Sequence, residues 1–192
     1  SPVLTINPTV RNVTIQPSAA LDLAGFVLLV TGSMDNAGTV TATPGVGGLS
    51  LGGTGTVGGS FNSLMLVSGP YSLSARVQVV HLSVNGVVGD LNLNDHTLAV
   101  DSLFSTGAGG LLTMQSARDS LLAQDLFFDG GSTAGRLTAG TIVATGLPTG
   151  VPVVATANDK AVEMLGSGSL GDTTALLSLG TYIAAMVHGT VN

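Results

Sequence analysis

The sequence has no cysteine, so neither disulfides nor thiolate metal sites are available to it. Tryptophan is also absent, and the aromatic residues that remain are two Tyr and five Phe. Grooves that cleave sugars usually contain aromatic side chains that stack against the sugar rings. With Trp absent, Tyr71 and Tyr182 are the Tyr residues that could serve in this way. Few aromatic residues also disfavour a sandwich core, where several are usual.

Charge is scarce: 8% of the residues are charged, against roughly 25% in an ordinary soluble domain. The net charge is −6, and the five basic residues are spread along the chain. They are Arg11, Arg76, Arg118, Arg136 and Lys160. Nucleic acids and anionic membranes require clustered basic residues, so neither is expected as a partner.

Long apolar runs are missing as well. The most apolar late stretch, Thr174 to Val187, is shorter than the roughly 20 residues that cross a bilayer, so no membrane span is predicted. Because the chain begins at Ser1 without Met, we expect a processed product or an excised fragment from which any signal peptide has been removed.

Glycine is abundant, with 28 of 192 residues, and short apolar pairs recur between Gly, Asn, Asp, Ser and Thr. Cores such as "LDL", "LSL" and "LNL" place apolar residues first and third and a polar residue between them. Every third core falls 21 to 28 residues after the last, in series that begin at Val13, Leu21 and Leu28. This pattern predicts an all-β parallel β-helix, or β-solenoid, with about three short strands per turn.

The repeat covers residues 1–156, which we expect to form the solenoid domain. Residues 157–192 fall outside it and are expected to be a C-terminal cap or an intersubunit assembly segment, in the same domain or apart from it. The predicted core includes Leu93, Met114, Val100, and Phe127 or Phe128. Alternation and turn spacing also fit an antiparallel β-sandwich or jelly roll, which stays open as the alternative.

The segment "NDHTLAVDSLFSTGAGGLLTMQSARDSLLAQDLFFDGGSTAGRLTAGTIVATG" resembles the repeats of bacterial secreted β-solenoid surface proteins of the adhesin type. The resemblance covers Gly89 to Gly146 well, Val10 to Ser83 loosely and the last 40 residues hardly at all. It carries no catalytic motif. It implies an extracellular or cell-surface location and an adhesive or structural role.

The sequence offers few candidates for catalytic or metal-binding residues. Asp119, Asp125 and Asp129 form the closest acidic cluster, and we expect them to be structural, bonding the backbone of turns. His81, His96 and His188 are isolated, and "FDGGST" lacks the Asp spacing of calcium-binding solenoid repeats. The Gly-rich stretch from Gly45 to Ser60 lacks the Lys that ends a phosphate loop. We therefore predict no catalytic, cofactor-binding or metal-binding residues and no cofactor.

These observations lead to the expectation of a non-enzymatic extracellular structural module, either a self-assembling fibre subunit or an adhesin stalk segment. Self-association is expected head to tail or by strand addition through the weakly charged ends, Ser1 to Asn7 and the segment after Gly171, with surface glycans as further partners. Two alternatives stay open: a carbohydrate-active β-helix enzyme, such as a polysaccharide lyase or hydrolase, and a module that binds ice or glycans.

Overall fold

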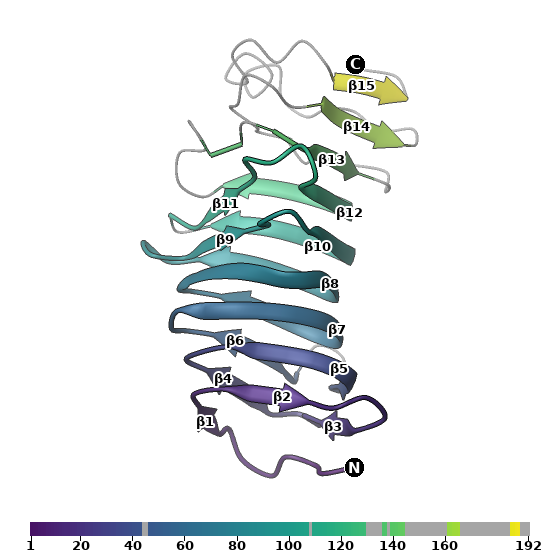
Figure 1. Ribbon diagram of the computed structural model, residues 1–192. Helices are drawn as coiled ribbons and strands as arrows, with labels where there is room; N and C mark the ends of the chain where they lie inside the picture. The colour runs from purple at the N-terminus through teal and green to yellow at the C-terminus, as the bar shows by residue number, and fades with distance from the viewer. Residues whose placement is uncertain are drawn as a thin grey trace.

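The computed structural model describes residues 1–43, 46–107, 109–129, 136–137, 139–144, 161–165 and 185–188. These residues form fifteen strands and no helix (Figure 1). The strands are β1 (Thr9–Val10), β2 (Val13–Ile15), β3 (Ala20–Asp22), β4 (Val27–Val30), β5 (Met34–Thr41), β6 (Gly48–Leu51), β7 (Gly55–Val67), β8 (Pro70–Asn85), β9 (Asp90–Asn92), β10 (Thr97–Gly107), β11 (Leu111–Thr113), β12 (Ser120–Asp129), β13 (Thr141–Ala144), β14 (Ala161–Leu165) and β15 (Ala185–His188).

The strands stack as successive turns of a coil, from β1 to β3 at the N-terminal end to β15 at the other (Figure 1). All fourteen strand pairs assigned among these residues are parallel, and each joins one turn to the next. The predicted all-β parallel solenoid, of about six turns, is therefore confirmed. An antiparallel sandwich is excluded, because its strands would pair in alternating directions.

The core is a set of apolar columns that run along the coil. One column is Leu21, Val40, Phe61, Val79, Val100 and Ala123, whose members lie 18 to 23 residues apart in sequence. Parallel pairing sets each of these residues about 4.8 Å above the one before it. Side chains that point inward on one turn thus meet inward side chains on the next, and the buried core runs from Ile15 to Ile142 among the described residues.

One predicted series of cores, the one that passes through Val77, was correct in the second half of the chain, and the predicted spacing was wrong in the first half. The column Val77, Leu98, Leu121 and Ile142 agrees with the predicted series. Leu21, however, pairs with Val40 and not with Leu49. The reason is that β5 is one strand of eight residues that pairs with both β2 and β3, through Met34 and Val40. In the same way β7 and β8 are 13 and 16 residues long and turn corners through shifts of register. Several predicted cores are consequently parts of one bent strand.

The predicted core residues Leu93, Val100 and Met114 are buried. The side chains of Phe127 and Phe128 lie outside the described part, and their neighbour Leu126 is buried.

Parallel pairing continues toward both ends of the described chain. Val3 bridges Asp22 in parallel, so the first residues continue the coil on the N-terminal side. β14 and β15 continue the parallel ladder from β13 into residues 157–192. The division at residue 156 stays a prediction, and most of the segment after it lies outside the described residues.

The described residues contain no helix that is long and apolar enough to cross a bilayer.

Candidate functional site

A groove of about 340 Å³ lies against the turns formed by β5, β7, β8 and β10. It is lined by Gly38, Thr39, Val40, Ser60, Phe61, Asn62, Gln78 and Asp101. The lining combines hydroxyl, amide and carboxylate groups, all of which exchange hydrogen bonds with polar ligands.

Strand alternation explains why these polar groups gather. Phe61 and Val79 are paired and point into the core, so their neighbours Ser60 and Gln78 point outward and are paired as well. Gln78 pairs in turn with Ala99 on β10, two residues before Asp101. Parallel stacking thus brings residues from successive turns to one side of the coil.

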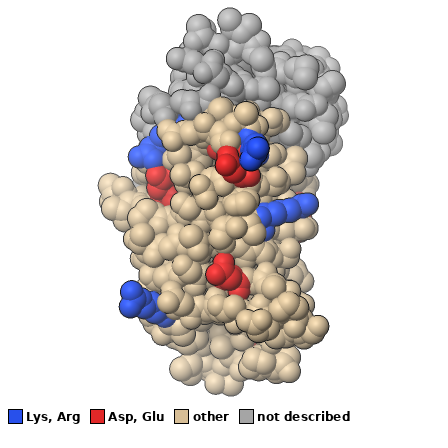
Figure 2. All heavy atoms as spheres, viewed as in Figure 1, with Lys and Arg blue, Asp and Glu red and all other residues tan. Residues whose placement is uncertain are grey.

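Gln78 and Asp101 are joined directly, because Gln78 Nε2 donates a hydrogen bond to Asp101 Oδ1 at 3.2 Å. Asp101 is exposed and Gln78 is half-buried. The second carboxylate oxygen of Asp101 is a further strong acceptor. Among the described residues, one ion pair forms, and it lies outside the groove. It joins Asp90 of β9 to Arg136, which is in a turn beyond β12. Figure 2 shows how few and scattered the charged side chains are on one face.

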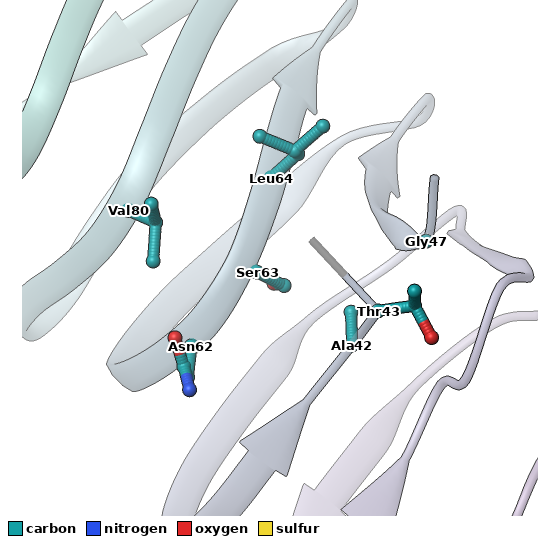
Figure 3. Close-up of a pocket in the computed structure, with 7 residues that line it drawn as sticks. All are labelled: Ala42, Thr43, Gly47, Asn62, Ser63, Leu64 and Val80. Carbon is teal, nitrogen blue, oxygen red and sulfur yellow. The ribbon is translucent and has the colours of Figure 1, made fainter. Parts of the chain in front are cut away.

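A smaller pocket of about 100 Å³ shares Asn62 with the groove (Figure 3). Its other lining residues are Ala42, Thr43, Gly47, Ser63, Leu64 and Val80. Ser63 is 5% exposed, and its hydroxyl has no hydrogen-bond partner among the described residues. A buried hydroxyl without a hydrogen-bond partner is unusual in folded proteins, so the Ser63 hydroxyl requires an explanation.

A third hollow, of about 310 Å³, shares Gly47 and Leu64 with the smaller pocket and has a mostly apolar lining that includes Val27, Val46 and His81. This places His81, one of the three histidines described above as isolated, beside an apolar surface. His96 is in the turn after Leu93 and donates its backbone N–H to the Leu93 carbonyl. The side chain of His188 lies outside the described part.

Asp119 is structural, as predicted. It is 2% exposed, and its carboxylate accepts backbone N–H groups from Gln115 and Ser116 in its own turn, at 2.8 and 3.0 Å. It also accepts the N–H of Asp95, at 2.8 Å, from the turn before. The carboxylate thereby fixes two successive turns of the coil.

Asp125 and Asp129 are not in turns, contrary to the sequence-based expectation. Both are in β12, where Asp125 pairs with Leu103 and Asp129 with Gly107. The strand is longer than the three-residue core assumed from the sequence. Their side chains lie outside the described part. Among the described residues, no group of three His, Asp or Glu side chains is arranged to hold a metal ion.

The groove residues Asn62, Gln78 and Asp101 were missed in the sequence. Each follows or separates apolar residues, in "FNS", "VQV" and "AVDS", and would be assigned to the outer surface by alternation alone. Their proximity depends on the register between β7, β8 and β10, which the sequence pattern did not give. The stretch from Gly48 to Ser60 forms β6 and the start of β7, which agrees with the rejection of a phosphate loop.

Comparison with known proteins gives a partial relative. No family model matches the chain, and no solved structure matches it significantly. A stretch of 59 residues, 31% of this chain, is 52% identical to a protein of Escherichia coli (strain K12) named "Uncharacterized sugar kinase YgcE". The chain covers 12% of the length of that protein.

This similarity corrects two of the sequence-based predictions. The partial relative is named as an enzyme, so the finding contradicts both the expectation of a non-enzymatic structural module and the expectation that the chain is not an enzyme. Those expectations rested on the repeat and on the lack of a recognisable catalytic motif. A repetitive scaffold does not determine function, because function depends on the site that the scaffold carries.

Proposed function

We propose that this chain is the saccharide-binding part of a carbohydrate-active enzyme, and that the groove containing Gln78 and Asp101 holds the saccharide. The observation that carries the proposal is the direct Gln78–Asp101 hydrogen bond in a groove lined by hydroxyl and amide side chains. The name of the partial relative, a sugar kinase, supports a sugar as the ligand class.

The groups of the groove match the hydrogen-bonding needs of a sugar. A sugar hydroxyl donates one hydrogen bond and accepts others, and neighbouring hydroxyls require several partners at fixed spacing. Asp101 accepts from a hydroxyl, Asn62 and Gln78 both donate and accept, and Thr39 and Ser60 do the same through their hydroxyls. Hydrogen bonds to the charged carboxylate are the strongest of this set.

The carboxylate of Asp101 also has the chemistry for proton transfer. A carboxylate within hydrogen-bond reach of a sugar hydroxyl is able to accept its proton as a general base when that oxygen attacks an electrophile. Gln78 holds the carboxylate in place during such a step, because it occupies one of the two oxygens. We assign binding and orientation of the sugar hydroxyl to this pair.

Calorimetric titration with a panel of soluble trisaccharides tests the proposal. We expect at least one of cellotriose, xylotriose and maltotriose to bind, and Asp101→Ala to weaken that binding roughly tenfold, as for loss of a charge-assisted hydrogen bond. Asp35→Ala is the matched control, since Asp35 is an exposed carboxylate that accepts a hydrogen bond from Ser74 and does not line the groove. Absence of binding to every soluble trisaccharide tested, or equal binding by Asp101→Ala, would overturn the proposal.

Incubation of the protein with ATP, magnesium and the bound trisaccharide, followed by mass spectrometry, identifies the type of reaction. An added phosphoryl group would indicate a kinase, and shortened chains would indicate a lyase or hydrolase. Asp101→Ala should slow either change.

We propose in addition that the protein self-associates and is located outside the cell, as its resemblance to secreted β-solenoid surface proteins implies. One observation favours association at the N-terminal end: Val3 and Ile6 are 55% and 67% exposed there, and β1 and β2 are paired on one side within the described residues. Light scattering of the protein with and without Ser1 to Asn7 tests association. A monomer at high concentration, unchanged by the deletion, would contradict it.

A further inference from the structure

The small pocket of Figure 3 contains a buried hydroxyl, that of Ser63, which has no hydrogen-bond partner in the described part of the chain. Ser63 is 5% exposed, and its Oγ makes no hydrogen bond among the described residues. Its side chain points toward Ala42 and Thr43 from the neighbouring turn (Figure 3). Serine in a core position without a hydrogen bond is less stable than alanine there, so the hydroxyl is unexplained by folding alone.

The remaining lining is apolar on the sides and polar where it meets the groove. Ala42, Leu64 and Val80 supply apolar surface, and Asn62 belongs to both the pocket and the groove. The pocket volume, about 100 Å³, is less than a third of the groove volume, about 340 Å³. A sugar held in the groove would therefore place a substituent, and not a ring, in the pocket.

We propose that this pocket is a subsite for the acetamido group of an N-acetylated sugar, an inference that rests on the proposed function. An acetamido group carries a methyl group, a carbonyl oxygen and an N–H. The methyl packs against Leu64 and Val80, the carbonyl accepts a hydrogen bond from Ser63 Oγ, and the N–H donates to Asn62 Oδ1. Ser63 lines the pocket, and its hydroxyl is available to donate because it has no hydrogen-bond partner among the described residues.

Chitotriose and cellotriose provide the matched probes, because they differ in carrying an acetamido or a hydroxyl group at the second carbon of each ring. In calorimetric titration we expect the wild-type protein to bind chitotriose roughly threefold to tenfold more tightly than cellotriose, as for one added hydrogen bond and a packed methyl. Ser63→Ala should reduce this preference to below about twofold and leave the Kd for cellotriose unchanged.

Ser63→Ala is expected to fold, since the Ser63 hydroxyl has no hydrogen bond to lose among the described residues, and thermal unfolding of the variant verifies this. Ala42→Leu is the second variant, because it fills the pocket from the opposite side and should weaken chitotriose binding without affecting cellotriose.

Equal affinity of the wild-type protein for the two sugars would overturn the acetamido subsite and leave the saccharide groove standing. A preference for chitotriose that survives in Ser63→Ala would also overturn it. Failure of the wild-type protein to bind either sugar or the other trisaccharides would overturn the groove and the subsite together.

Discussion

Gln78 and Asp101 belong to successive turns of the solenoid and are joined by a hydrogen bond of 3.2 Å between Nε2 and Oδ1. No covalent or sequence-local constraint brings them together; 23 residues separate them in the chain. Their proximity follows from the pairing of Gln78 with Ala99 and Val79 with Val100. A side chain on one turn thus orients a carboxylate on the next.

The first prediction concerns this pair. Gln78→Ala should weaken trisaccharide binding, but by less than Asp101→Ala, because it frees the carboxylate without removing it. The free energy of unfolding should change by about 0.5 kcal/mol or less, since both groups lie at the surface. Calorimetric titration and chemical denaturation measure the two effects. A loss of binding greater than that of Asp101→Ala would show that Gln78, and not the carboxylate, is the main sugar ligand.

Asp119 gives a prediction on stability. Asp119→Ala removes the acceptor of three backbone N–H groups, those of Asp95, Gln115 and Ser116, in a buried place. We expect a loss of about 2–4 kcal/mol in the free energy of unfolding by urea denaturation. Saccharide binding by the folded fraction should not change. A variant as stable as the wild type would contradict the structural role.

Leu93 tests the core. It is fully buried, so Leu93→Asp places an unpaired carboxylate among apolar side chains and should cost several kcal/mol. Val87→Asp is the matched control, because Val87 is 91% exposed and the same change there should cost little. Melting temperatures compare the two. Equal melting temperatures would mean that Leu93 is not in the core.

Tyr71 predicts a dependence on alkaline pH. Burial raises the pKa of Tyr71 above its usual value of 10.0, while a hydrogen bond with the backbone of Gly53 opposes this in part. The folded state thus holds the phenol proton more tightly than the unfolded state. Its contribution to stability is complete below pH 10 and is lost as pH rises through the raised pKa.

Unfolding measured between pH 8 and pH 11.5 should therefore show stability declining above about pH 10. Tyr71→Phe should reduce this decline and cost about 1 kcal/mol at neutral pH, because the Tyr71 hydroxyl donates to the Val30 carbonyl at 3.0 Å. An identical slope in the variant would exclude Tyr71 as its source.

Much of the fold was accessible from the sequence, because parallel stacking repeats one local pattern. Leu93, Val100 and Met114 were assigned to the core from alternation and are buried. Asp119 was assigned to a turn because Asp commonly bonds the nearby backbone, and it does so here.

The site was less accessible, because it depends on which residues of different turns lie side by side. The assumed three-residue cores misplaced the turns in the first half of the chain, where β7 and β8 bend through shifts of register. Three strands supply the groove residues: Asn62 is in β7, Gln78 in β8 and Asp101 in β10. Alternation along each strand identifies each of them only as an ordinary surface residue.

The parallel register has a consequence for how the length of this protein can change. Val79 and Val100 occupy equivalent places in the core column, as do Val100 and Ala123. Removal of residues 79–99 would bring Val100 directly above Phe61, so an apolar residue would follow an apolar residue and the coil would be one turn shorter. Deletions or duplications of whole turns keep every column in phase, whereas a slip of one residue in the register exchanges core for surface. Gene segments of about 20 residues are therefore natural units of insertion and loss in such a chain.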